Sequence, residues 1–390
     1  MKNVVIAGIG MTPFAHTPGL GIRALAVSAA EEALADSGLS ADAVEQLFFG
    51  NAVASTVTQQ DMVKGQVAFR GSSLDGLPVI NVENACASGS SAFNLAVKMV
   101  AGGVADVILV VGTEQLTSPD KTRSFKALRG ATDIFEIGEA GPDEDWTKSI
   151  LMKFYAEEGA AFLRRTPVTR EDFAQVSVKN RHHASLNPLA QFRKEQTVDD
   201  VMNARLIADP LTLTMCSPMS DGAAAVVVCS EEYATANVTG PVVRVLGTEV
   251  RGTRRQAPVV EAAQAVYAAT GLSVADMHVI ELHDAAAPAE LIQYGQIGLA
   301  EPGEEYRLIR GGDTALGGRV PVNTSGGLMS RGHALGATGV AQLVELSTQL
   351  RGEAGARQVN NATRAMAVNT GGWFAGDYAV AVATILEREQ

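Results

Sequence analysis

Hydrophobic residues along the chain form short apolar runs separated by longer, alanine-rich stretches with polar positions at helical spacing. The first apolar run covers residues 4–7, an alanine-rich stretch follows at 24–37, and a second apolar run lies at 44–49. Short apolar runs between turn residues are typical of buried strands, and longer periodic stretches are typical of helices. Strands that alternate with helices predict an α/β protein with a largely buried sheet.

The same pattern occurs again in the second half of the chain. Predicted strands lie at 242–246 and 279–282, with a predicted helix at 259–269 between them. The tripeptide Gly-Leu-Ser follows the first helix of each half, beginning at Gly38 and at Gly271. Glycine commonly ends a helix, and serine then opens the next turn. We therefore predict two copies of one α/β unit, formed by residues 1–117 with 214–240 and by residues 241–390.

A segment without this alternation, residues 118–213, interrupts the first copy. It contains predicted helices at 146–165 and 169–183, the second of which begins with Thr169 and Asp172 at capping-box spacing. The acidic stretch 136–145 is predicted to be a solvated loop. The first copy resumes with a strand at 223–228. An insertion of this kind is a natural lid or ligand-binding layer.

Composition narrows the class of protein. The 390 residues are 46% hydrophobic and 19% charged, as in well-packed globular proteins. The net charge of −12 argues against a nucleic-acid partner, although a local basic patch could still bind a polyanion such as coenzyme A. The three cysteines lack disulfide or metal spacing, which suits a reducing compartment. No apolar run approaches the ~20 residues that span a bilayer. We expect a cytoplasmic protein without a resident metal or membrane partner.

One cysteine and one histidine occupy matching places in the two copies. Cys86 leads the predicted helix that runs to residue 100, and His333 leads the one that runs to residue 350. A helix N-terminus and a nearby imidazole both lower the pKa of a thiol, so this pairing predicts a nucleophilic thiolate. Cys216 and Cys229 lie in apolar runs and are predicted to be core residues.

The segments around these residues resemble the thiolase superfamily. The resemblance rests on NACASGSS at 84–91, SPMSDGAAA at 217–225, NTSGG at 323–327 and GHALGATG at 332–339. Within the superfamily, His283-Asp284 resembles the sterol-carrier-protein type, since ordinary thiolases have Asn-Glu there. The resemblance implies a thiolase fold, with duplicated βαβαβαββ halves in α-β-α-β-α layers and an inserted loop domain.

The resemblance also implies the site residues. Cys86 would attack the thioester and carry the acyl group. His333 would deprotonate the Cys86 thiol, and His283 would complete the catalytic set. The backbone N–H groups of Cys86 and Gly371 would form an oxyanion hole. The pocket would further include Asn369, Asp284, Ala285 and Ala286.

The chain departs from the family at the second catalytic cysteine. Asn369 stands at its usual position, and Ala285 stands at the position that sterol-carrier-protein types can use. Neither side chain titrates, so neither can move a proton. Three reactions avoid this need: decarboxylative Claisen condensation, acyl transfer to an acceptor that is already nucleophilic, and retro-aldol cleavage. A non-catalytic acyl-CoA-binding subunit is the remaining alternative.

Partners follow from the same resemblance. The substrate would be a thioester of coenzyme A or of an acyl carrier protein, and Lys121, Arg123 and Arg254 could bind its phosphates, unless they belong to solvated charged loops. Thiolases pair through the first-half sheet, so we expect at least a dimer, with residues 48–53 as the edge strand. Relatives that lack the second cysteine often work with a small OB-fold protein.

Overall fold

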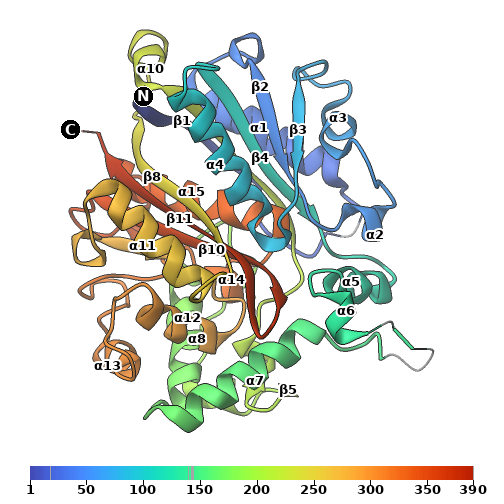
Figure 1. Ribbon diagram of the computed structural model, residues 1–390, viewed down its shortest axis with the longest axis vertical. Coiled ribbons are helices and arrows are strands. Elements are labelled where there is room, and N and C mark those ends of the chain that lie inside the picture. The colour runs from blue at the N-terminus through green and yellow to red at the C-terminus, as the bar shows by residue number, and fades with distance from the viewer. Residues whose placement is uncertain (18, 139, 142–144, 390) are drawn as a thin grey trace.

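The computed structural model describes residues 1–17, 19–138, 140–141 and 145–389, and a long twisted sheet runs through it (Figure 1). The sheet orders nine strands as β3-β2-β4-β7-β1-β8-β11-β10-β9 within these residues. The first half supplies β1 (Val4–Met11), β2 (Gln46–Gly50), β3 (Val79–Val82), β4 (Val107–Gln115) and β7 (Asp221–Ser230). The second half supplies β8 (Val243–Gly252), β9 (Val279–Glu281), β10 (Arg364–Phe374) and β11 (Asp377–Arg388).

The pairing of these strands repeats between the halves. In the first half β2 is parallel to β4, and β7 is antiparallel to both β4 and β1. In the second half β9 is parallel to β10, and β11 is antiparallel to both β10 and β8. An isolated parallel bridge from Ile280 to Val322 takes the place of β3. The predicted duplication is confirmed, and β1 joins the halves by pairing with β8.

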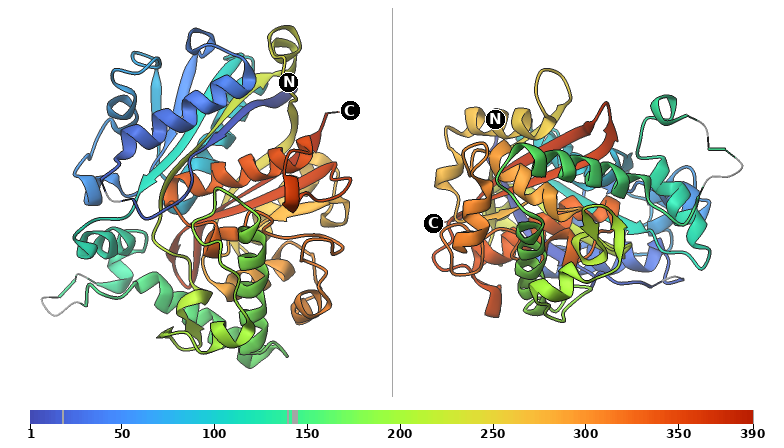
Figure 2. Two further views of the ribbon diagram at one scale, coloured as in Figure 1. Left: turned by 180° about the vertical axis from the view of Figure 1, so that it is seen from behind. Right: turned by 90° about the horizontal axis from the view of Figure 1, so that it is seen from below.

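Helices form three layers around the sheet (Figures 1 and 2). Helix α1 (Ile22–Ser37) packs on the outer face of the first half, and α11 (Pro258–Thr270) packs on the outer face of the second. Between the halves, α4 (Ser88–Ala101) and α15 (Leu335–Arg351) pack against each other in one apolar cluster. The layered fold is therefore as expected. Gly38 and Gly271 end α1 and α11 with φ of 73° and 70°, a conformation that glycine adopts without strain.

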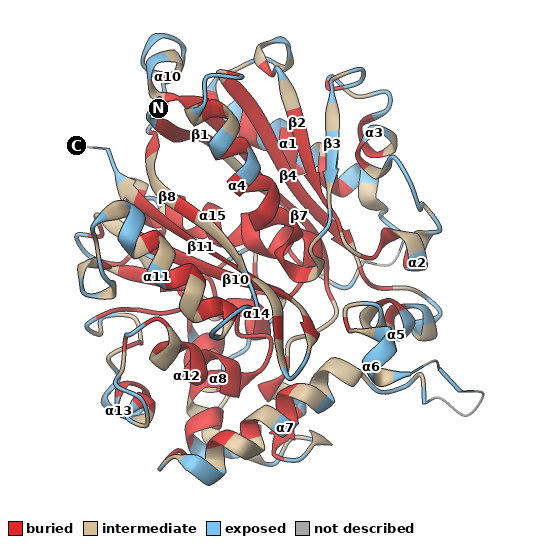
Figure 3. Ribbon diagram, in the orientation of Figure 1, coloured by how far each residue is buried: buried red, intermediate tan, exposed pale blue. Residues whose placement is uncertain are grey.

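The inserted segment lies at one end of the molecule. It contains α5 (Lys121–Arg129), α6 (Ile134–Ile137), α7 (Ile150–Arg165), α8 (Arg170–Ser185), α9 (Val198–Met202), β5 (Leu206–Ala208) and β6 (Leu211–Thr212). The predicted capping box of Thr169 and Asp172 is present at the start of α8. The acidic stretch 136–145 begins inside α6, and its positions 139 and 142–144 lie outside the described residues. Colouring by burial shows that α7 buries one side and exposes the other (Figure 3).

Shorter helices connect these elements. They are α2 (Ala54–Thr58), α3 (Lys64–Phe69), α10 (Glu231–Asn237), α12 (Ala287–Gln296), α13 (Glu305–Gly311) and α14 (Gly327–Ser330). Among the described residues, no helix has the length and apolar character needed to cross a membrane.

The predicted edge strand is wrong. Residues 46–50 form β2, which lies between β3 and β4 and is hydrogen-bonded on both sides. The edge of the first-half sheet is β3, a four-residue strand whose apolar run is interrupted by Asn81. A run of four residues that includes a polar one gives little indication of a strand in the sequence.

Candidate active site

The site forms where the first turns of α4 and α15 meet. Cys86 lies in the turn of Ala85–Ala87 that leads into α4, and Ala85 adopts a positive φ of 48° there. His333 lies just before α15. The Cys86 Sγ and His333 Nε2 atoms are 3.2 Å apart, and both residues are buried. The structure thus brings the predicted nucleophile and base, one from each half, into hydrogen-bond contact.

Contacts on the far side of the His333 ring fix its tautomer. The Thr338 hydroxyl donates its proton to the carbonyl of Ala334 at 2.9 Å, so it can only accept from His333 Nδ1, at 2.8 Å. The proton of the neutral ring therefore lies on Nδ1, and Nε2 presents a lone pair to the Cys86 thiol. The Ser220 hydroxyl accepts the backbone N–H of His333 at 2.9 Å and holds the segment in place.

The charge state of this pair differs from the sequence-based expectation. Burial, together with the neighbouring carboxylates of Glu114 and Glu83, raises the pKa of the Cys86 thiol to about 12. Burial also lowers the pKa of His333 to about 3, assisted by the cation of Arg331. The expected lowering of the thiol pKa is wrong for the free site, because desolvation outweighs the helix N-terminus. The resting pair is a neutral thiol and a neutral imidazole.

His283 completes the cluster from the end of β9. Its ring centroid lies 5.2 Å from that of His333, with the two rings nearly perpendicular. The side chain of Gln293, on α12, accepts the His283 N–H at 3.1 Å and donates to the His283 carbonyl at 2.8 Å. Burial and the neighbouring His333 and Arg331 lower the pKa of His283 well below its usual range, so this ring is also neutral.

One thiol and two imidazoles are also a soft-metal ligand set. Single ligand atoms of Cys86, His283 and His333 lie within 4.8 Å of one another. Sulfur and imidazole ligands suit Zn²⁺. The expected absence of a metal therefore stays a prediction.

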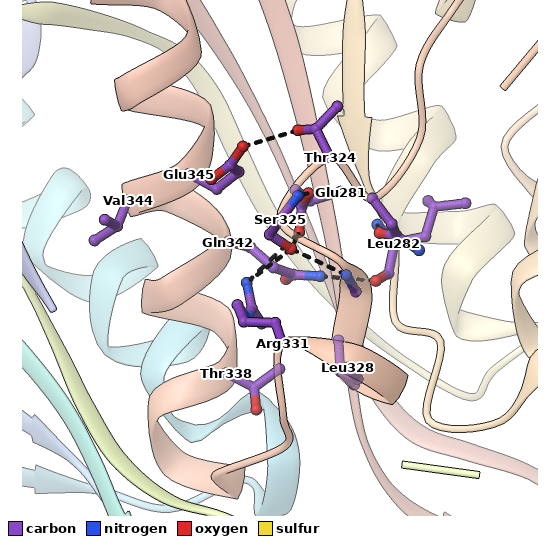
Figure 4. A network of polar contacts seen from close by, with 12 residues as sticks. Glu281, Leu282, Thr324, Ser325, Leu328, Arg331, Thr338, Gln342, Val344 and Glu345 are labelled. Carbon is purple, nitrogen blue, oxygen red and sulfur yellow. Dashed lines mark hydrogen bonds and ion pairs between the residues drawn. The ribbon is translucent and has the colours of Figure 1, made fainter. Parts of the chain in front are cut away.

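A buried polar network links α15 to the segments that contain Leu282 and Thr324 (Figure 4). Arg331 Nη1 lies 3.5 Å from Glu281 Oε2 and 3.4 Å from the Ser325 hydroxyl. On α15, Gln342 donates to the carbonyls that directly precede His283 and Asn369, those of Leu282 at 3.0 Å and Val368 at 3.2 Å. One side chain therefore bridges the end of β9, which leads to His283, and the middle of β10, which carries Asn369.

Asn369 and Gly371 lie on β10, opposite the Cys86 turn. Asn369 Nδ2 is 3.0 Å from His283 Nδ1, so the residue at the position of the missing cysteine contacts a site histidine. A Cβ atom on Gly371 would lie 2.1 Å from the carbonyl oxygen of Asn84 and 2.8 Å from the nitrogen of Ala87. Only glycine allows β10 to lie this close to the nucleophile turn.

The residues after His283 have distinct places. The Asp284 carboxylate accepts from the backbone of Leu328 at 2.7 Å and from Asn180 at 2.9 Å, so it caps α14 away from the thiol. Ala285 lines the cavity beside Cys86, whereas Ala286 is fully buried in the core of the second half.

The cavity that reaches Cys86 and His333 has a volume of about 710 Å³. Apolar side chains from α5, α7 and the β5 region form much of its wall: Phe125, Leu128, Ile150, Leu151 and Ile207. Cys216, predicted to be a core residue, lies in this wall as well, while Cys229 is fully buried. Residues of the inserted segment therefore form much of the cavity wall, and a ligand-binding role for this segment stays a prediction.

The cations of this cavity are not those predicted. Lys148, Lys153 and Arg205 line it. Lys121 and Arg123 are exposed on α5, and Arg254 is exposed beyond the end of β8 near Glu261. The role of these three toward coenzyme A stays a prediction. Lys148 and Lys153 flank the start of α7 and form no dense basic cluster in the sequence, so no sequence signal marks them in advance.

Comparison with known proteins places this geometry in a family. The family models described as "Thiolase, N-terminal domain" and "Thiolase C-terminal domain-like" match residues 4–232 and 249–388. Benzoylsuccinyl-CoA thiolase subunit BbsB of Thauera aromatica is 36% identical over 95% of this chain and 95% of its own. Acetyl-CoA acetyltransferase of Methanothermobacter thermautotrophicus is 34% identical over 95% and 97%, and sterol carrier protein 2 of Gallus gallus is 34% identical over 95% and 70%.

Two solved structures share the fold. The Ltp2-ChsH2(DUF35) aldolase superposes with a TM-score of 0.80 and 24% identity, covering 100% of this chain and 98% of the other. Human mitochondrial 3-ketoacyl-CoA thiolase gives a TM-score of 0.73 and 18% identity, covering 100% and 99%. With both family models matched and the strand order repeated in its two halves, the chain belongs to the thiolase superfamily, in its sterol-carrier-protein-2-like branch.

Proposed function

We propose that this protein is an acyltransferase that forms an acyl-enzyme on Cys86 from a coenzyme A thioester and transfers the acyl group to a carbon nucleophile. The observation that carries the proposal is the 3.2 Å contact between Cys86 Sγ and the lone pair of His333 Nε2. A neutral thiol needs a base at this distance, because its own pKa of about 12 leaves almost no thiolate at neutral pH.

In the acylation step, Sγ attacks the thioester carbonyl while the thiol proton passes to His333 Nε2. The C–S bond to coenzyme A then breaks, and the same proton leaves with the departing thiolate as CoASH. The backbone N–H groups of Cys86 and Gly371 are our candidates to stabilise the tetrahedral oxyanion. Loss of one such donor typically lowers the rate by ~10²–10³.

The second step is proposed to be a decarboxylative Claisen condensation, because Asn369 cannot abstract a carbon-bound proton. A malonyl-type thioester loses CO₂ and leaves an enolate, which attacks the acyl-enzyme. A new C–C bond forms, the bond to Sγ breaks, and the Cys86 thiolate takes a proton from solvent. After CoASH has left, His333 Nε2 is again unprotonated, so His283 is the site histidine available to donate a hydrogen bond to the enolate oxygen.

Mass spectrometry of the intact protein tests the acyl-enzyme. We expect incubation with one member of an acyl-CoA and malonyl-CoA panel to add the mass of one acyl group, and Cys86→Ala to abolish the adduct. Cys216→Ala is the matched control, since that thiol lines the same cavity but makes its hydrogen bond to the carbonyl of Thr212. An adduct that survives in Cys86→Ala, or no adduct with coenzyme A or carrier-protein thioesters, would overturn the proposal.

A second candidate is a subunit that requires a partner protein. Two of the similar proteins favour it: BbsB is named as a thiolase subunit, and the Ltp2 structure is an aldolase complex with a DUF35 protein. In this case the site would act in acyl transfer or retro-aldol cleavage together with a small OB-fold partner. Activity that appears only when such a protein is co-expressed and co-purifies would favour this candidate over the first.

A further inference from the structure

We infer that Asn369 is a positioning residue that holds His283 as the Nε2–H tautomer, so that the two site histidines present opposite protonation states to the substrate. This inference rests on the proposed function, in which His283 donates to the enolate oxygen. It assigns a task to the residue that stands where other thiolases carry their second cysteine.

The first observation is the direction of the amide. The Ser90 hydroxyl lies 2.7 Å from Asn369 Oδ1 and 3.0 Å from the carbonyl oxygen of Ala87. Its one proton goes to the nearer acceptor, Oδ1, which turns the amide Nδ2 toward His283 Nδ1 at 3.0 Å. An amide nitrogen only donates, so Nδ1 must accept and carries no proton. Because the ring is neutral, its single proton then lies on Nε2. Within the described part of the chain, Nε2 makes no hydrogen bond to protein, and the ring, which is 1% exposed, packs beside His333.

The second observation is how firmly this arrangement is held. Asn369 is 1% exposed. A Cβ atom on Gly339 of α15 would come within 2.8 Å of Asn369 Oδ1 and 2.7 Å of Ser90 Cβ, so the amide is enclosed by two helices. Gln342 of α15 also donates to the backbone carbonyls that directly precede His283 and Asn369.

The chemical consequence is an asymmetric pair of imidazoles. Thr338 keeps the proton of His333 on Nδ1, which leaves Nε2 as the base for Cys86. Asn369 keeps the proton of His283 on Nε2, which makes it a neutral donor. A neutral donor suits this buried site, since an imidazolium there would be strongly disfavoured. A cysteine at position 369 could not make this directional donation with comparable strength, since S–H is a weak donor.

The decisive measurement is the tautomer of His283 in the free enzyme. Protein labelled with ring-¹⁵N histidine would be studied by long-range ¹H–¹⁵N correlation NMR, with His283→Gln used to assign the signals. We expect a pyrrole-type Nε2 and a pyridine-type Nδ1 for His283, and the reverse for His333. The opposite amide orientation would place the His283 proton on Nδ1, and that result would overturn the inference.

Asn369→Asp supplies the functional arm. Its carboxylate only accepts, so the proton of His283 should move to Nδ1, and condensation should fall by ~10²–10³, as for loss of an oxyanion donor. The rate of Cys86 acylation, measured by mass spectrometry of the intact protein, should fall much less. Asn94→Asp is the matched control: it alters a buried amide on α4 that donates to Thr248, and it should leave both histidine spectra unchanged. Equal losses in both steps, without a change of tautomer, would make Asn369 merely structural.

The two proposals fail separately. The NMR measurement requires no turnover, so an Nε2–H tautomer without any acyl-enzyme would refute the proposed function and leave the positioning role intact. An acyl-enzyme together with the Nδ1–H tautomer of His283 would support the proposed function and refute the positioning role of Asn369.

Discussion

At the scale of single residues, burial decides the chemistry of the site. Cys86, His283 and His333 are all buried, and each therefore favours its neutral form. Hydrogen bonds then decide where each proton lies, through Thr338 for one imidazole and Asn369 for the other. The site holds no charged nucleophile at rest, so charge develops only as a thioester is attacked.

A neutral resting thiol predicts the pH dependence of alkylation. With a pKa of about 12, the thiolate fraction of Cys86 rises tenfold per pH unit throughout the neutral range. We expect its rate of modification by iodoacetamide, read as the mass adduct lost in Cys86→Ala, to keep increasing beyond pH 9. A rate that reaches a plateau below pH 7 would instead indicate a thiolate–imidazolium pair.

At the scale of elements, close approach of β10 to the Cys86 turn shapes the site. Gly371→Ala would force a methyl group into the carbonyl of Asn84, at 2.1 Å. Since backbone cannot yield as a side chain does, we expect the strand to shift and acylation to slow by ~10² or more, as for a lost oxyanion donor. The measurement is the rate of acyl-adduct formation. Gly376→Ala, in the β10–β11 turn, is the control, although its φ of 78° carries its own strain. Wild-type acylation in Gly371→Ala would contradict this role.

Helix α8 is joined to the second half by a buried histidine. His183 Nδ1 donates to the carbonyl of Asn323 at 3.0 Å, and Nε2 accepts from the N–H of Leu316 at 3.1 Å. Only the neutral ring can make both contacts, because Nε2 must accept, and burial lowers the pKa of His183 to about 3. The helix therefore depends on an uncharged imidazole.

This dependence predicts acid sensitivity. Because the folded pKa lies below the unfolded value of about 6.5, the stabilisation by neutral His183 is complete above pH 6.5 and is lost as the pH falls toward 3. Between pH 7.5 and 5 the loss should be about 2 kcal/mol. Urea unfolding at pH 7.5 and pH 5 measures this loss in wild type and in His183→Gln. The difference in free energy of unfolding between the two proteins should be smaller at pH 5 than at pH 7.5. A difference that stays constant would contradict the predicted titration.

At the scale of the whole molecule, β3 is the exposed edge of the first-half sheet. Ile80 is 40% exposed there, and β2 is the one strand that pairs with β3 among the described residues. A strand with one free edge and an exposed apolar side chain is suited to pairing with a second copy. We expect a dimer by light scattering, and a monomer when Ile80 is replaced by lysine. Val104→Lys is the control, because that exposed apolar residue lies away from the edge. A dimer that tolerates Ile80→Lys would exclude this interface.

The sequence by itself determined the duplicated α/β architecture, the inserted layer and the pairing of Cys86 with His333. These features follow from local periodicity, glycine caps and contiguous motifs, which a chain displays in one dimension. Only the tertiary structure decided the edge strand, the cations of the cavity, the neutral state of the thiol and the contact between Asn369 and His283. Each depends on which groups lie together and away from water, and residues 283 and 369 meet only because β9 and β10 pair side by side. Desolvation and directional hydrogen bonds act through space, so the order of residues along the chain cannot reveal them.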